Sequence, residues 1–311
     1  MKVLITGATG LVGRAMVELC LSNDIGVHYL TTKKRKLVSQ ENHHGFYWNP
    51  NKNEIDIACF KGVDVIINLA GASITKRWTK RNRNIILNSR VNSLRTLRLG
   101  LEELQDHTVT KLVSASAIGI YPSSLTDFYK EDEKNSTNEF LGKVVQAWEK
   151  EVDTFAVLGV NTVKLRIGLV LSNKGGALPK IVKPIRNFVG APFGSGEQWQ
   201  SWIHINDLAQ LFLFAAKTDI NGVFNAVAPN PVTNSKMTKA VATAVSMPIL
   251  MPNIPKLALQ VLLGKMHVLL VDSHRVSSKK IQKKGFDFQY QNITMALQDL
   301  YPSVKKQTPI L

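Results

Sequence analysis

The sequence predicts an α/β protein: a Rossmann-type, doubly wound parallel sheet with a smaller C-terminal, substrate-side domain. Short, nearly continuous apolar segments alternate with helical patterns through roughly the first 230 residues. Such segments are typical of strands buried on both faces, as in a parallel sheet covered by helices. A glycine-rich turn follows the first of them, and glycine and proline loops replace the alternation after residue 170.

Six apolar segments are predicted as strands: Lys2–Thr6, Val27–Thr31, Val63–Leu69, Lys111–Ala115, Thr162–Leu165 and Val223–Ala226. We expect residues 1–170 to form an NADP-binding Rossmann domain whose sheet is completed by later segments, up to about residue 230. Residues 171–311 are expected to form the substrate-side and C-terminal domain.

A glycine-rich turn follows the first predicted strand, and an apolar helix follows the turn. Gly7 permits a tight turn, Gly10 lets the backbone approach a pyrophosphate, and Gly13 lets helix and strand pack closely. Free N–H groups at the positive end of the helix would then face the phosphates. The turn therefore predicts a dinucleotide site with contacts at Gly7, Thr9, Gly10, Leu11, Val12 and Gly13.

The end of the second predicted strand bears on the choice between NAD and NADP. A carboxylate there would bind the ribose 2′-hydroxyl of NAD and repel the 2′-phosphate of NADP. This strand instead runs into Thr31, Thr32 and Lys33, with no acid. Because hydroxyls and cations suit a phosphate, the sequence predicts NADP, as NADPH, in preference to NAD. A solvated basic turn is the alternative.

The longest predicted helix runs from about Lys80 to Leu104, where apolar residues recur at three- and four-residue steps. Arg90 lies on the same inward-facing stripe. A buried guanidinium needs an anionic or polar partner. Arg90 is therefore expected either to meet such a partner or to lie at the stripe's edge with its head group in water.

Further motifs are spread along the whole chain. They include Asn68–Gly71, Ser89-Arg90, Arg166–Leu171, Ser201–Leu208 and Gly285-Phe286. Together with the Thr-Gly-x-x-Gly-x-x-Gly turn, they resemble the epimerase family of atypical short-chain dehydrogenases/reductases, which carries a C-terminal domain of unknown function. The resemblance implies a Rossmann fold, a nicotinamide dinucleotide cofactor and an oxidoreductase or epimerase activity.

The resemblance also implies cofactor contacts at individual positions. The matching residues are Thr31, Thr32, Leu69, Ala70, Gly71, Arg90 and, near the nicotinamide end, Val170. Many family members have an arginine where Thr32 stands, and Lys33 and Lys34 can take its place here.

The usual proton-transfer pair of short-chain dehydrogenases is missing. Those enzymes place a tyrosine and a lysine four residues apart on a helix, where the ammonium lowers the pKa of the phenol. The corresponding helix, expected at about residues 138–158, contains Phe140 and Lys143 but no tyrosine. Family members often have a cysteine where Val145 stands, and that thiol is absent too.

Other residues remain as candidates for the chemistry. Ser116 matches an upstream serine that hydrogen-bonds substrate in related enzymes, and Tyr121 could supply a phenol, so both are assigned as catalytic. Trp202 and His204 are assigned to the substrate pocket. The alternative for Ser116 is a serine that caps the strand end, and for Tyr121 a partly buried loop aromatic. For His204 the alternative is a structural histidine. Asp207 is expected to cap the following helix.

Composition excludes several classes of protein. Cys20 and Cys59 form no Cys-x-x-Cys pair, which favours a reduced, cytoplasmic setting without disulfides. We expect no membrane partner, because no signal-peptide pattern is present and the apolar stretch 257–271 is interrupted by Lys265 and His267. No His, Cys, Asp or Glu spacing predicts a metal site.

The net charge of +16 raises the question of a nucleic-acid partner. The basic clusters are dispersed and lack interleaved aromatic residues, so we expect a basic surface around an anionic cofactor and no nucleic acid. The predicted function is that of an NADP-dependent oxidoreductase or epimerase acting on a small molecule, such as a sugar nucleotide or a carbonyl compound. A non-catalytic NADPH-binding sensor or scaffold is the alternative, and a monomer or homodimer is expected.

Overall fold

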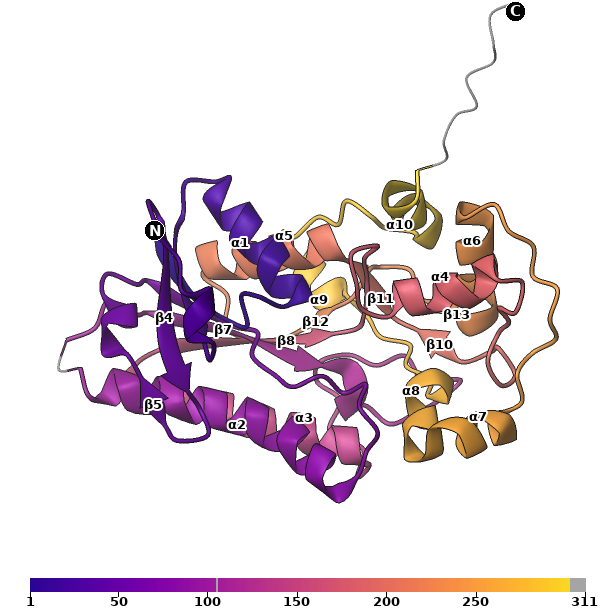
Figure 1. Ribbon diagram of the computed structural model, residues 1–311, viewed down its shortest axis with the longest axis horizontal. Helices are drawn as coiled ribbons and strands as arrows, with labels where there is room; N and C mark the ends of the chain where they lie inside the picture. Colours follow the sequence, from indigo (N-terminus) through magenta and orange to yellow (C-terminus); the bar gives the residue numbers. More distant parts are fainter. Residues whose placement is uncertain (105, 303–311) are drawn as a thin grey trace, which may run out of the picture.

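The computed structural model describes residues 1–104 and 106–302, so the last nine residues of the predicted second domain lie outside the described part. A mostly parallel sheet lies between two layers of helices, with α1 (Leu11–Leu21) and α5 (Ile205–Lys217) on one face (Figure 1). The opposite face is covered by α2 (Lys80–Glu102) and α3 (Phe140–Asp153). This arrangement confirms the predicted doubly wound α/β fold.

The main sheet has the strand order β12-β8-β7-β6-β1-β2-β4-β3, with β5 paired to β4. The chain thus winds in opposite directions from β1, as expected of a doubly wound sheet. The strands are β1 (Lys2–Thr6), β2 (Gly26–Thr31), β3 (Ser39–Gln40), β4 (His43–Asn49), β5 (Glu54–Ile55), β6 (Val65–Asn68), β7 (Lys111–Ala117), β8 (Asn161–Ile167) and β12 (Gly222–Ala226).

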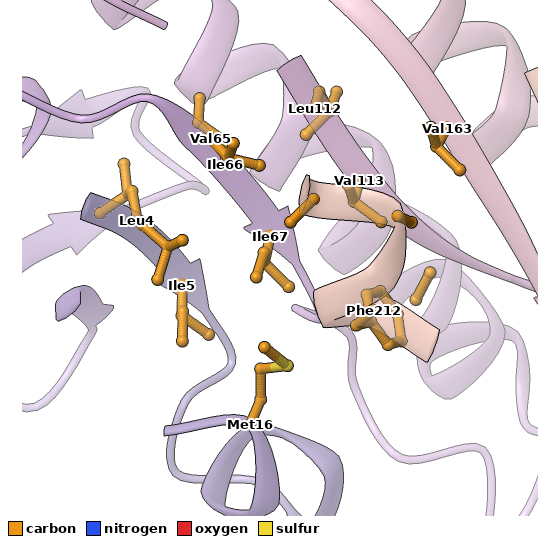
Figure 2. Close-up of a cluster of buried hydrophobic side chains, with 14 of the residues drawn as sticks. Leu4, Ile5, Met16, Val65, Ile66, Ile67, Leu112, Val113, Val163 and Phe212 are labelled. Atoms are coloured by element: carbon orange, nitrogen blue, oxygen red, sulfur yellow. The ribbon is translucent and has the colours of Figure 1, made fainter. Parts of the chain in front are cut away.

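Each strand predicted from the sequence corresponds to a strand of this sheet, while β4 was not predicted. β4 pairs in parallel with β2 near the sheet edge and is mostly half-buried, so it lacks a continuous apolar run. The central strands are apolar because helices cover them. Figure 2 shows Ile5 and Ile67 lying toward Met16 of α1 and Phe212 of α5.

The C-terminal half adds two small sheets and several helices. β9 (Leu169–Leu171) pairs with β11 (Trp202–His204), and β10 (Trp199–Gln200) pairs with β13 (Val232–Thr233). The helices are α4 (Leu178–Arg186), α6 (Asn234–Ala244), α7 (Lys256–Leu263), α8 (Val268–Val271), α9 (Lys279–Gln282) and α10 (Ile293–Leu300). Because α5 and β12 return to the main sheet, the chain crosses between the two parts more than once, and the boundary at residue 170 stays a prediction.

The stretch after Pro255 is not one continuous helix. α7 ends at Leu263, where Gly264 has a positive φ of 56°, and a 3₁₀ turn (Gly264–His267) leads into α8. The chain then runs beside β10, where His274 forms a bridge with Gln200. This segment thereby brings C-terminal residues to the carboxyl end of the main sheet.

Candidate functional site

The turn between β1 and α1 has room for glycine alone at two positions. Gly7 has a φ of +69°, and a Cβ on it would lie 2.7 Å from the carbonyl oxygen of Leu69. A Cβ on Gly13 would lie 2.2 Å from the carbonyl oxygen of Gly7. At Gly10 the nearest atom, the same Gly7 oxygen, is 3.1 Å away. The first two glycines therefore allow close packing, while Gly10 keeps its outer side open.

The first turn of α1 presents free N–H groups. Gly10 is the N-cap residue and has no capping side chain. The amides of Leu11, Val12 and Gly13 donate to no group in the described part of the chain, and the first intrahelical bond runs from Arg14 to Gly10. Uncapped amides at the positive end of a helix suit a phosphate. These residues therefore fit the pyrophosphate of a dinucleotide.

A cavity of about 500 Å³ lies beside this turn. Half of the residues assigned to the cofactor from the sequence line it: Gly7, Thr9, Thr31, Thr32, Lys33, Ala70 and Gly71. Lys36, from the 3₁₀ turn after β2, lines it too and was not singled out from the sequence. None of the lining residues is an Asp or a Glu. The cavity thus has the charge that suits an additional phosphate.

The β6 end of this cavity is fixed by Thr6. Its hydroxyl accepts hydrogen bonds from the amides of Leu69 and Ala70, both at 3.1 Å, and donates to Asn68. Val170, in β9, lies on the other side of the turn, where the following glycine loop reaches the side chain of Leu11. Leu69, Ala70 and Val170 therefore lie around the glycine turn.

Arg90 is partly buried and has no carboxylate partner in the described residues. Its guanidinium donates to the carbonyl oxygens of Ile86 (2.9 Å) and Ala72 (3.2 Å) and lies 5.0 Å from the centre of the Trp148 ring. Burial lowers the pKa of Arg90 to about 10. It lies against Gly71 and lines a second cavity. Of the two outcomes expected for Arg90, a polar partner is the one observed.

The two residues assigned as catalytic belong to a buried hydrogen-bonded network. The hydroxyl of Ser116 donates to Glu149 Oε1 at 2.5 Å, and Arg166 binds both carboxylate oxygens of Glu149 at 2.9 Å. Arg166 also donates to the hydroxyl of Tyr121 at 3.0 Å, which in turn donates to Asn225 at 2.7 Å. Both hydroxyls are therefore engaged within the protein.

This network sets the chemistry available to Tyr121. Burial raises the pKa of its phenol, although Arg166 opposes the shift. The side chain is 1% exposed but lines a cavity. The catalytic assignment of Ser116 and Tyr121 stays a prediction, because the structure shows how the hydroxyls are held and not what they do.

A cleft opens between α3 and the C-terminal segment. It consists of two cavities, of about 570 and 260 Å³, that share Gly119, Leu141, Val268, Asp272 and His274. We call it the substrate-side cleft. Trp78 and Phe140 form an aromatic wall, with ring centres 5.1 Å apart, and the Arg83 guanidinium lies over the Phe140 ring. Lys143 and Lys265 add positive charge from opposite sides.

Sequence reasoning missed Asp272 and His274, which come from the C-terminal segment. Burial raises the pKa of Asp272, and Glu139 adds to the effect. Burial lowers the pKa of His274, which keeps this imidazole neutral at pH 7. No local pattern marks either residue, because the fold brings them here from more than a hundred residues away.

Trp202 and His204 lie away from the substrate-side cleft. Trp202 is fully buried in the C-terminal core, where its indole donates to the carbonyl of Asn230. His204 lines a separate cavity of about 340 Å³ beside α1. Both residues belong to β11, which directly precedes α5 and is buried along its whole length. His204 shares this cavity with Leu11, but the structure does not bring Trp202 and His204 together with Ser116 and Tyr121.

His204, rather than Asp207, caps α5, which corrects the expectation for Asp207. The Nδ1 atom of His204 accepts from the amide of Asn206, and Nε2 lies 3.2 Å from Asp299. Asp207 instead accepts from the amides of Gln289 and Tyr290. It therefore fixes the C-terminal segment against the helix.

Acid is expected to unfold the protein partly through His204. Burial lowers its pKa to about 4, although Asp299 opposes the shift. Between the ordinary pKa of 6.5 and this value, the unfolded chain binds one more proton than the folded chain. The stabilisation that comes from keeping His204 neutral is therefore fully present above pH 6.5 and is lost as the pH falls towards 4. The loss is up to about 3 kcal/mol. Urea unfolding of wild type and His204→Asn, which keeps a capping side chain, should show a flatter pH profile in the variant; parallel profiles would contradict this.

Residues 3–226 match the NAD dependent epimerase/dehydratase family, and residues 254–300 match a domain of unknown function, DUF1731. The chain belongs to the NAD dependent epimerase/dehydratase family. An epimerase family protein of Staphylococcus aureus (strain MRSA252) is 37% identical over 298 residues, covering 96% of this chain and 98% of that protein. These matches also confirm the resemblance to the atypical short-chain dehydrogenases/reductases.

Solved structures of epimerase family proteins agree with this assignment. Human epimerase family protein SDR39U1 (isoform 2) with NADPH has a TM-score of 0.84 and 25% identity, covering 98% of this chain and 100% of that one. A nucleoside-diphosphate sugar epimerase from Corynebacterium glutamicum has a TM-score of 0.74 and 28% identity, covering 97% of this chain and 58% of that one.

Each of the two matched regions contributes a part of the candidate site. The glycine turn, the cavity beside β2 and the buried network lie in the epimerase/dehydratase region. Lys265, Asp272 and His274 lie in the C-terminal region. In the part of the chain that the structure describes, no three His, Cys, Asp or Glu residues could hold a metal ion. No helix there is long and apolar enough to cross a membrane.

Proposed function

We propose that this family member is an NADP-dependent oxidoreductase or epimerase acting on a small molecule. The observation that carries the proposal is the acid-free cavity beside the uncapped N-terminus of α1. The pyrophosphate would lie on Leu11, Val12 and Gly13, beside Thr9 and Gly10. The NADPH in the structure of the human relative supports the same cofactor.

Lys33 and Lys36 would bind the 2′-phosphate, together with Thr31 and Thr32. Leu69, Ala70 and Gly71 would line the middle of the cofactor, and Arg90 and Val170 its nicotinamide end. When bound, the nicotinamide supplies hydride transfer. The protein's own residues orient the substrate and move the proton.

The substrate-side cleft favours a small molecule that carries an anionic group. The cleft is lined by three cationic side chains, Arg83, Lys143 and Lys265, and by the aromatic wall. It contains two acids, Glu139 and Asp272. Its volume lies within the range of small-molecule sites. A sugar nucleotide and a carbonyl compound with a carboxylate or phosphate both fit this description. We propose that Ser116 and Tyr121 support this site through their network.

A non-catalytic NADPH sensor is the second candidate. It is favoured by the engaged hydroxyl of Tyr121 and by the absence of a tyrosine from α3. A panel of 2-oxo acids, aldehydes, ketones and uridine-diphosphate sugars separates the two. An enzyme oxidises NADPH or converts a sugar nucleotide with at least one of them, whereas a sensor binds NADPH and turns over none.

Reversing the charge at Lys33 is expected to weaken NADPH binding selectively. Lys33→Glu places a carboxylate in the cavity proposed for the 2′-phosphate, so NADPH affinity should fall roughly 10- to 100-fold, or about 1.4–2.8 kcal/mol. NADH affinity should change less than about threefold, since NADH lacks that phosphate. Fluorescence titration measures both.

Lys34→Glu is the matched control for this experiment. Lys34 is the next residue, but its ammonium lies over the Tyr47 ring and the side chain does not line the cavity. The same charge change there should leave the ratio of the two affinities nearly unchanged. An equal loss of NADPH affinity in both variants would indicate a general electrostatic effect and contradict the assigned phosphate site.

A further inference from the structure

His274 occupies the junction of the substrate-side cleft. His274 lines both cavities, so a molecule that fills either one lies beside this residue. The larger cavity also contains Tyr121, but the hydroxyl of that residue already donates to Asn225 and accepts from Arg166. His274 thus brings an imidazole, a group that can exchange a proton near neutral pH, to the junction of the two cavities.

The protein holds His274 in one orientation. The backbone amide of His274 donates to the carbonyl of Trp199 at 3.0 Å, and its carbonyl accepts from Ser201 at 2.9 Å. The ring Nε2 lies 3.0 Å from the carbonyl oxygen of Tyr121. A carbonyl oxygen only accepts, so Nε2 carries the hydrogen.

This contact leaves the other ring nitrogen available. In neutral His274, Nδ1 bears the lone pair, and it has no hydrogen-bond partner among the described residues. The imidazolium keeps the same bond from Nε2 to Tyr121, so the ring can gain or lose a proton at Nδ1 without turning. A general base or acid needs a fixed orientation of this kind.

The charges around His274 come from every element that packs against the cleft. Burial favours the neutral ring, while the hydrogen bond to the carbonyl of Tyr121 opposes this shift of the pKa. The charged and titratable neighbours are Arg83 and Arg90 of α2, Glu139 and Lys143 of α3, Lys265, His267 and Asp272 of the C-terminal segment, Tyr121, and the adjacent Arg275.

We propose that His274 replaces the missing tyrosine as the proton donor and acceptor for the substrate oxygen. This proposal rests on the proposed function. In the reducing direction, the carbonyl carbon gains a hydride from the reduced nicotinamide dinucleotide, and the carbonyl oxygen gains the proton of Nδ1. The products are an alcohol, the oxidised cofactor and neutral His274. In the oxidising direction, Nδ1 accepts the alcohol proton.

The test compares His274→Gln with His44→Gln on the carbonyl and sugar-nucleotide panel. Glutamine keeps an N–H for the carbonyl of Tyr121 but has no titrating nitrogen. His274→Gln should lower kcat by on the order of 10²- to 10⁴-fold. KM and the NADPH dissociation constant should stay within about twofold, because the group acts in proton transfer rather than binding. His44 lies in β4, outside both cavities of the cleft, and its variant should keep kcat within about threefold.

The pH profile and ring tautomer give readouts that a purely structural role would not change. Wild-type alcohol oxidation should fall as the pH drops through the pKa of His274, below its usual 6.5, and the variant should lose this limb. Nitrogen NMR of the free protein should show the Nε2–H tautomer, and NADP⁺ should shift the ring resonances. An Nδ1–H tautomer, or a ring insensitive to NADP⁺, would overturn the proposal.

The outcomes separate this proposal from the proposed function. Wild-type turnover with an unaffected His274→Gln variant would overturn the role of His274 and leave the oxidoreductase or epimerase in place. Absence of wild-type turnover across the whole panel would contradict the proposed function itself, and the role of His274 with it.

Discussion

Replacing Gly10 with valine is expected to weaken NADPH binding at least about 100-fold, or roughly 2.8 kcal/mol, in a folded protein. Gly10 has extended backbone angles (φ −76°, ψ 178°) that valine adopts readily. Its Cβ would lie 3.1 Å from the carbonyl oxygen of Gly7, a tight contact that a backbone shift of a few tenths of an ångström would relieve. The branched side chain would instead occupy the space in front of the amides of Leu11, Val12 and Gly13.

Gly26→Val is the matched control, because it makes the same glycine-to-valine change away from the glycine turn. Gly26 begins β2, at the opposite end of the sheet from the glycine turn, and a Cβ there meets only the Lys2 side chain at 3.4 Å. Titration with NADPH and thermal melting should show unchanged affinity in Gly26→Val and a folded but non-binding Gly10→Val. Retained affinity in Gly10→Val would mean that the pyrophosphate lies elsewhere.

Replacing Glu149 with leucine is expected to cost about 3–5 kcal/mol of unfolding free energy. The Arg166 and Glu149 side chains are only 9% and 10% exposed, so the variant leaves a guanidinium in the interior without its carboxylate. The hydroxyl of Ser116 loses its acceptor as well. Breaking one partner of a buried pair is costly because the remaining charge stays desolvated.

The double variant Glu149→Leu/Arg166→Met tests this reason. It removes both charges together, so urea unfolding should show it to be more stable than Glu149→Leu alone. A single variant that loses less than about 1 kcal/mol would show that the network is not energetically important. The network also bears on the site, because the carbonyl that holds His274 belongs to Tyr121.

The cofactor side of the site could be predicted from the sequence because its signals are local. The glycines of the turn are spaced for one strand–turn–helix unit, and the acid-free end of β2 directly follows an apolar strand. Lys36 was the exception. It reaches the cavity because the chain turns back after β2 in a 3₁₀ turn, which the sequence does not mark.

The substrate side could not be predicted in the same way. His274 meets Tyr121 across 153 residues of sequence, and no spacing within either segment indicates this contact. Trp202 and His204 looked suitable for a pocket by residue type. Their burial on β11 was decided by tertiary packing against the C-terminal helices. The residue type alone therefore does not predict which polar and aromatic side chains share a cleft, because tertiary packing decides it.

In the function proposed above, the cavity beside β2 selects NADPH through its 2′-phosphate. The most direct test is to titrate the wild-type protein with NADPH and NADH under identical buffer and salt. We predict that NADPH binds at least about tenfold more tightly, a difference of about 1.4 kcal/mol. NADH binding as tightly as NADPH, or more tightly, would contradict the account.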